Sequence, residues 1–148
     1  MNTLNEDLLA AWLRLSTSVI NSRVVSELSY NESLVCNVLY TALKNNPEDP
    51  LTATDLCNTT RMLKSQMNRT LNQLEKREMI IRQRSESDKR KIFILLNQNK
   101  LSDYEKQHSS ILQLIDGIIS HLGEDKTYET MALFYEISNI ADNLLKEK

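Results

Sequence analysis

Glycine and proline are scarce in this sequence of 148 residues, which contains only two of each. So few chain breakers are untypical of a β-sandwich with its many turns, and they favour a mainly helical fold. Long apolar runs are absent, so the sequence predicts no transmembrane helix. The first seven residues are polar and acidic rather than basic. They do not resemble a signal peptide, and we expect a cytoplasmic protein.

Clusters of metal ligands and enzyme motifs are absent too. Cys36 and Cys57 lack metal-ligand spacing, and His108 and His121 lie far away in the sequence. There is no glycine-rich phosphate loop, Gly-x-Ser-x-Gly motif or His-Glu-x-x-His motif. We therefore expect no enzymatic activity, no cofactor and no metal. Both cysteines are interpreted as buried apolar filler, because the alternative, a redox switch, needs an accessible and acidic thiol.

A general excess of positive charge is also lacking, since the net charge is −2. The charges are nevertheless unevenly distributed along the chain. Residues 61–91 contain ten basic and four acidic residues, whereas the remainder contains eight basic and sixteen acidic residues. A basic segment within an acidic chain is typical of a contact with the phosphate backbone of a nucleic acid.

Apolar residues recur at steps of three and four over most of the chain, which predicts a series of helices. We expect Asn31 to cap the second helix, Thr52 and Asp55 to form a capping box on the third, Asn97 to cap the fifth, and Gly123 to end it. A loop with two prolines separates the second and third helices. The expected helices cover about 5–28, 32–44, 52–59, 64–77 and 98–122, with a last helix ending near 145.

The pattern changes to that of a β-hairpin after the fourth helix. Residues 79–84 and 91–96 are rich in β-branched and apolar side chains and flank a polar segment. Two helices joined by a tight turn and followed by a hairpin have the order of a winged helix-turn-helix, whose second helix enters the major groove of DNA. We therefore predict a mainly α fold, of α+β type, that contains this DNA-binding module.

Helical periodicity divides residues 64–77 into two faces. The apolar positions, which we expect to pack on the core, are Leu63, Met67, Leu71 and Leu74. The opposite face carries amide, hydroxyl and basic side chains that can read base edges. A merely solvated face would usually carry Glu as well, and here only Glu75 interrupts the pattern. The residues of this helix that we expect at the DNA are Lys64, Ser65, Gln66, Asn68, Arg69 and Asn72.

The hairpin carries a second basic cluster. Arg82 and Arg84 lie in its first strand, and Lys89 and Arg90 lie near its tip. Arginine on a protruding loop suits the narrow minor groove, where negative potential is concentrated. The alternative is a surface hairpin that is kept soluble by charge.

These segments resemble the MarR family of winged helix-turn-helix transcriptional regulators. The resemblance is carried by LTATDL at 51–56, MNRTLNQLEKR at 67–77, DKR at 88–90 and ILLN at 94–97. It implies a homodimer whose N- and C-terminal helices interlock, and in which each protomer presents one recognition helix and one wing to a pseudo-palindromic operator. Most members of the family are repressors, many released by small aromatic or phenolic ligands and others by cysteine oxidation.

The resemblance also implies a domain organisation and particular residue roles. The whole of 1–148 would form one MarR-type domain, with the DNA-binding part at 31–97 and the dimerisation helices at 1–30 and 98–148. Arg90 would enter the minor groove while Asp88 holds a basic residue of the same chain, for which Arg77 is our suggested partner. Trp12, Tyr30 and Tyr40 would line a ligand cavity between the dimer helices and the DNA-binding module.

The sequence departs from the family pattern at three positions. The family usually has Gly where this chain has Arg61 and Glu78, and a small polar cap where it has Leu63. A side chain at positive φ costs on the order of 1 kcal/mol, so these turns are expected to be strained.

The terminal helices carry more apolar residues than one small core requires, which predicts a dimer interface. The alternative is a thick monomeric bundle. The residues concerned are Leu8, Leu9, Trp12, Ile115, Ile118, Ile119, Ile137 and Ile140.

Two other functions remain open at this stage. One is a winged-helix module that binds proteins, which acidic residues in place of Ser65, Arg69 or Arg90 would indicate. The other is a helical ligand-binding protein that does not contact DNA. We favour a sequence-specific transcriptional regulator, because the recognition face and the wing are both basic and polar.

Overall fold

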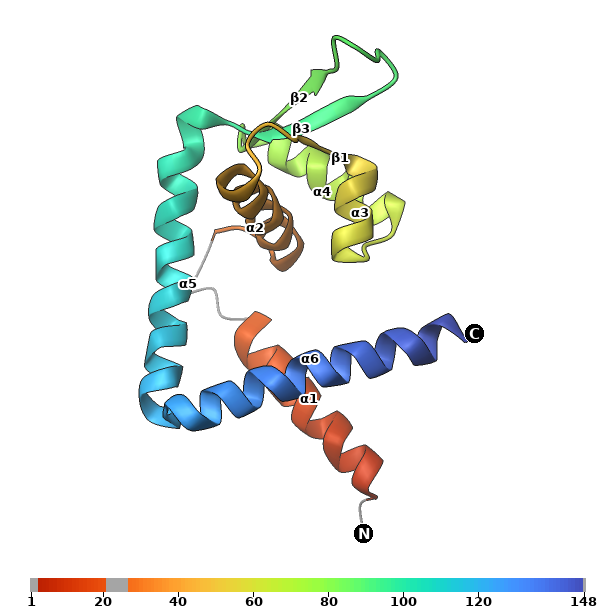
Figure 1. Cartoon of the computed structure of the whole chain (residues 1–148). Helices are drawn as coiled ribbons and strands as arrows, with labels where there is room; N and C mark the ends of the chain where they lie inside the picture. Colours follow the sequence, from red (N-terminus) through yellow and green to blue (C-terminus); the bar gives the residue numbers. More distant parts are fainter. Residues whose placement is uncertain (1–2, 21–26, 148) are drawn as a thin grey trace. The chain divides into compact units, whose positions relative to one another are not determined.

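The computed structural model describes residues 3–20 and 27–147 (Figure 1). It confirms a mainly helical fold with a small antiparallel sheet. Part of the first predicted helix, residues 21–26, lies outside the described residues. The elements are α1 (Leu4–Ile20), α2 (Tyr30–Asn45), β1 (Leu51–Thr52), α3 (Ala53–Thr60), α4 (Lys64–Lys76), β2 (Ile80–Arg84), β3 (Ile92–Leu96), a 3₁₀ turn η1 (Gln98–Lys100), α5 (Leu101–Leu122) and α6 (Glu124–Lys146).

The chain divides into two compact units, Met1–His108 and Ser109–Lys148. The first unit contains α1 to α4, the sheet and the start of α5, and the second contains the rest of α5 together with α6. No helix in the described part of the chain is both long and apolar enough to cross a membrane.

The sheet of the first unit has the strand order β1-β3-β2, and both pairings are antiparallel. Ile80 pairs with Leu96 at the base of the predicted hairpin, which extends away from the helices of the module (Figure 1). Leu51 of β1 pairs with Ile94 on the other side of β3. This two-residue strand was not predicted, because it is too short to show an alternating pattern.

The core of this unit lies between α2, α3, α4 and the sheet. Met67, Leu71 and Leu74 of α4 are at most 1% exposed, as the helical periodicity predicted. The expectation that Leu63 joins them was wrong. Leu63 is the N-cap of α4, has an extended backbone and is 67% exposed, because the helical spacing does not extend to a residue outside the helix.

The caps of the helices were predicted with mixed success. The capping box of α3 is present, since Asp55 N–H donates to the Thr52 hydroxyl and Thr52 N–H donates to the Asp55 carboxylate. For α2 the prediction of Asn31 was wrong, because the helix begins earlier. Ser29 is the N-cap and forms a capping box with Glu32. Asn97 caps η1, which leads directly into α5.

Both positions at which the family usually has Gly adopt the left-handed backbone conformation. Arg61 has φ 63° after α3, and Glu78 has φ 61° after α4. At the end of α4 the Glu78 N–H donates to the Glu75 carbonyl and the Met79 N–H donates to the Leu74 carbonyl, each at 2.9 Å. This is a Schellman motif, which places the left-handed residue directly after the C-cap.

We predict that Glu78→Gly stabilises the protein, because Gly adopts positive φ without steric cost. The expected gain is about 1 kcal/mol, or roughly 2–4 °C in the melting temperature of a chain of this size. Lys76→Gly, two residues earlier and inside the helix, is the matched control and should destabilise by about 1 kcal/mol. Denaturant unfolding of both variants measures the two effects. A loss of stability in Glu78→Gly would contradict the claim that the backbone at Glu78 is strained.

Candidate nucleic-acid interface

The outer face of α4 is exposed because its inner face fills the core. All six residues predicted to contact DNA from this helix are exposed to solvent. Gln66 has an additional local role: its side-chain oxygen accepts a hydrogen bond from the Leu63 N–H at 3.1 Å, which is the half of a capping box that the N3 residue supplies. The six residues are Lys64, Ser65, Gln66, Asn68, Arg69 and Asn72.

The wing, residues 80–96, is organised by hydrogen bonds within its turn. The Ser85 N–H donates to the Lys91 carbonyl, the Lys91 N–H donates to the Asp88 carbonyl, and the Asp88 N–H donates to the Ser85 hydroxyl. Arg84 also donates to the carbonyl of Lys89. These bonds close the turn and leave the side chains of Arg84, Lys89 and Arg90 exposed.

Asp88 holds the base of Arg90. Its Oδ1 atom accepts the Arg90 backbone N–H at 3.1 Å and the Arg90 Nε–H at 3.2 Å. The bond from the backbone N–H, followed by the bond from the Arg90 side chain, lowers the pKa of Asp88 below its ordinary value. The Arg90 side chain remains 92% exposed, so the pair orients the guanidinium without covering it.

The suggested pair between Asp88 and Arg77 must be corrected. Arg77 is the C-cap of α4, and its guanidinium is directed at the start of α2 instead. Its Nη1 atom lies 3.5 Å from Glu32 Oε2 and donates to the Glu27 carbonyl at 3.1 Å. Glu32 is buried, so Arg77 compensates a carboxylate that is largely removed from water. Arg77 therefore joins α4 to α2 rather than to the wing.

Arg82 is also held within the protein. Its Nη1 atom donates to Glu75 Oε1 at 2.9 Å, and its Nη2 atom donates to Asn72 Oδ1 at 3.1 Å. Both acceptors are on α4, so the arginine fastens β2 to the recognition helix. Arg82 was predicted to contact DNA, and Glu75 was the one interruption of the polar face of α4; the pair that they form accounts for both.

Of the three residues suggested for a ligand cavity, Tyr40 lies in an aromatic cluster. Its ring centroid is 5.2 Å from that of Tyr104 and 5.6 Å from that of His108, and its hydroxyl donates to Glu105 Oε2 at 3.3 Å. Trp12 and Tyr30 are more than half exposed.

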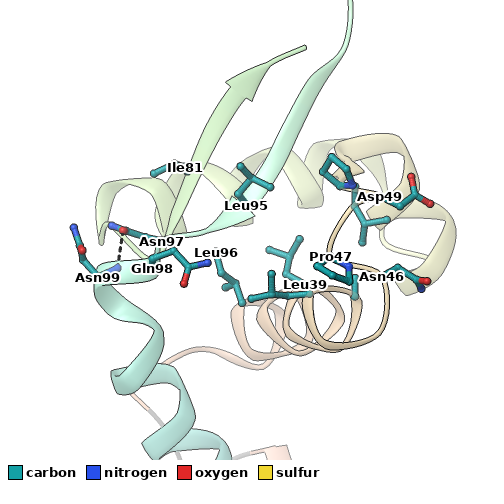
Figure 2. Close-up of a pocket in the computed structure, with 14 residues that line it drawn as sticks. Leu39, Asn46, Pro47, Asp49, Ile81, Leu95, Leu96, Asn97, Gln98 and Asn99 are labelled. Atoms are coloured by element: carbon teal, nitrogen blue, oxygen red, sulfur yellow. Dashed lines mark hydrogen bonds between the residues drawn. The ribbon is translucent and has the colours of Figure 1, made fainter. Parts of the chain in front are cut away.

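A pocket of about 270 Å³ lies elsewhere, at the base of the wing (Figure 2). Leu39 of α2, Pro47 of the following loop, and Ile81 and Leu95 of the sheet form its apolar lining. Residues 97–99 close one end, where the Asn99 N–H donates to the Asn97 side chain at 3.1 Å. None of the predicted site residues lines this pocket, and no sequence pattern indicated it. Among the described residues, no three His, Cys, Asp or Glu side chains are grouped as metal ligands.

Solved structures of known proteins share this fold. A MarR/EmrR-family regulator from Acinetobacter sp. ADP1 superimposes with a TM-score of 0.78 at 16% identity, covering 96% of this chain and 99% of the other. The transcriptional repressor CouR, bound to a 23-mer DNA duplex, gives 0.76 at 20% identity with 92% of each chain covered. BpsR of Bordetella bronchiseptica, whose DNA binding is regulated by 6-hydroxynicotinic acid, gives 0.72 at 14% identity, covering 93% and 94%.

No curated protein sequence matches the chain. The sequence model of the MarR family matches residues 41–91, from α2 to the far side of the wing turn. Over these residues, which include α3, α4 and most of the wing, the chain matches the MarR family. Members of the MarR family are transcriptional regulators that bind DNA, and they are not enzymes.

The two cysteines of the chain occupy different surroundings. Cys36 is buried in the core, and burial followed by the charge of Glu32 raises the pKa of its thiol to about 12. Cys57 is only partly buried. The interpretation as buried filler is therefore confirmed for Cys36, whereas Cys57 keeps some access to solvent.

We predict that Cys36 resists thiol reagents in the folded protein. With a pKa of about 12, roughly one thiol in ten thousand is ionised at pH 8. In the variant Cys57→Ala, a chromogenic disulfide should label Cys36 only after unfolding, whereas Cys36→Ala should be labelled at Cys57 in the folded state. Rapid labelling of folded Cys57→Ala would show that Cys36 is accessible.

Proposed function

We propose that this chain represses transcription as a homodimer on a pseudo-palindromic DNA site, which it contacts with α4 and the wing. The observation that carries the proposal is the pairing of charges on this surface. The one carboxylate on the outer face of α4, Glu75, is neutralised by Arg82. Phosphate therefore meets a surface of basic, amide and hydroxyl groups without an unpaired negative charge on that helix face.

The contacts divide into two groups by position. Ser65, Gln66, Asn68 and Arg69 occupy the exposed side of α4 and are proposed to face base edges in the major groove. Lys64 at the start of the helix and Arg84, Lys89 and Arg90 on the wing are proposed to contact phosphates and the minor groove. Among solved structures with this fold, CouR is bound to a DNA duplex, which supports duplex DNA as the partner of this chain.

The proposed dimer uses 1–30 and 98–148, while 31–97 binds DNA, within one MarR-type domain. Each of the long terminal helices exposes several large apolar side chains. Leu4 of α1 is 84% exposed, Ile118 of α5 is 45% exposed and Phe134 of α6 is 52% exposed. Removing apolar surface from water stabilises by about 25 cal/mol per Å². A second copy of the chain that covers these faces would therefore stabilise the protein.

We also propose that a small aromatic or phenolic effector controls DNA binding. The partly exposed rings of Tyr40 and His108, which pack against the buried ring of Tyr104, are proposed to stack with the effector, and Tyr40 bears a hydroxyl. Trp12 and Tyr30 are proposed to complete the effector site in the dimer. BpsR, which shares the fold, is regulated by 6-hydroxynicotinic acid, and this supports an aromatic effector.

The central experiment is selection of bound sites from randomised duplex DNA. The recovered sites should be inverted repeats whose half-sites are about one helical turn apart, because a two-fold dimer places its recognition helices at that spacing. Arg69→Ala should weaken binding to the recovered site by about 1–3 kcal/mol and relax one position in each half-site. Lys126→Ala, which removes an exposed positive charge from α6, is the control. Unrelated sequences, or binding by a monomer, would contradict the proposal.

The wing gives a second prediction, in which two substitutions remove charges of opposite sign. Arg90→Ala should weaken binding and lower the salt slope by about 1, because one phosphate contact is lost. Asp88→Ala removes a negative charge, so charge alone predicts tighter binding. Because Asp88 orients Arg90 through two hydrogen bonds, we expect weaker binding instead. Affinities over a salt series decide, and tighter binding by Asp88→Ala would contradict the orienting role.

A further inference from the structure

We infer that Arg82 and Glu75 fix the side-chain amide of Asn72, so that Asn72 presents its NH₂ group to DNA. Asn72 would thus recognise a hydrogen-bond acceptor through a donor that is held in place. The inference rests on the proposed function of α4, and it concerns the specificity of that same surface.

The orientation of the amide follows from the chemistry of its neighbour. A guanidinium group has five N–H donors and no acceptor. The Asn72 atom that lies 3.1 Å from Arg82 Nη2 must therefore be the oxygen, as observed. Rotating the amide by half a turn would place its NH₂ group against the guanidinium, where two sets of donors would face each other. The NH₂ group of Asn72 consequently points away from Arg82.

The guanidinium is itself held in place. Its Nη1 atom forms an ion pair with Glu75 at 2.9 Å, three residues after Asn72 on the same face of α4. The backbone of Arg82 pairs with Ile94 in the middle of β3, so the sheet fixes the position at which the Arg82 side chain starts. The Arg82 side chain is only 28% exposed, which limits its freedom to swing toward DNA. One arginine therefore neutralises Glu75 and orients Asn72 together.

The consequence for recognition comes from the pattern of groups in the major groove. Paired reading of adenine needs the asparagine oxygen for the 6-amino group and the asparagine NH₂ for N7. Arg82 already occupies one of the two lone pairs of the Asn72 oxygen and fixes the plane of the amide, so the NH₂ group is the part of Asn72 that we expect to contact DNA. Its partner is an acceptor, which is a base atom such as guanine O6 or N7 or thymine O4, or else a phosphate oxygen.

The first test removes the N–H donors of residue 72 while keeping an oxygen that accepts from Arg82. Asn72→Asp still accepts from Arg82 but has no N–H, and Gln73→Glu adds the same charge at the adjacent exposed position. We expect Asn72→Asp to bind the selected duplex at least about tenfold more weakly than Gln73→Glu does. A loss confined to the selected duplex identifies a base acceptor, and an equal loss on random duplex identifies a phosphate. Equal affinities of the two variants would overturn the inference.

The second test asks whether Arg82 positions Asn72. Asn72→Ala is measured in the wild-type background and in the double variant Glu75→Gln/Arg82→Met, which releases the amide without leaving an unpaired carboxylate. The loss caused by Asn72→Ala should be about tenfold in the wild type and markedly smaller in the double variant. Equal losses would overturn the positioning role. Wild-type protein that selects no DNA sequence would overturn the proposed function and this inference together, whereas selective binding with equal losses overturns the inference alone.

Discussion

The packing of one face of α4 is the constraint on which the rest of this surface depends. Met67, Leu71 and Leu74 are removed from water almost completely, and α2, α3 and the sheet surround them. Their burial fixes the rotation of the helix about its own axis. Because the helical repeat then places Ser65, Arg69 and Asn72 on the opposite side, the chemistry of the exposed face follows from the packing of the hidden one.

Features governed by local periodicity could be predicted from the sequence. The inner face of α4 and the hairpin depend on neighbours within a few positions, whereas the left-handed Arg61 and Glu78 were expected because the family usually has Gly there. The Ser29–Glu32 capping box is equally local, and its Ser-x-x-Glu pattern is present in the sequence, although Asn31 was the predicted N-cap. The strand β1 could not be recognised, because two residues show no alternation and its pairing depends on β3, about forty positions away.

The partners of the arginines could not be predicted for a different reason. Each side chain is long, and its choice of partner depends on how elements distant in sequence are packed. Arg77 lies 45 residues after Glu32 in the chain, yet it contacts that buried carboxylate. Arg82 was assigned to DNA because its sequence neighbours are basic, whereas the fold presents it with Glu75 and Asn72. Composition predicts that a segment is basic, and only packing decides which charges remain available.

The arginines thus serve two purposes on one surface. Arg77 and Arg82 form ion pairs within the protein. Arg77 joins α4 to α2, and Arg82 joins α4 to β2. Arg90 is held by Asp88 through its backbone N–H and its Nε–H, and its side chain is still 92% exposed to solvent. A paired arginine holds its neighbours in a defined geometry, so in the proposed complex the inner pair would set the angle at which the exposed groups meet DNA. The proposed function then makes the affinity for phosphate depend on the outer residues, and the selectivity depend on how firmly the inner ones hold α4 to α2 and to β2.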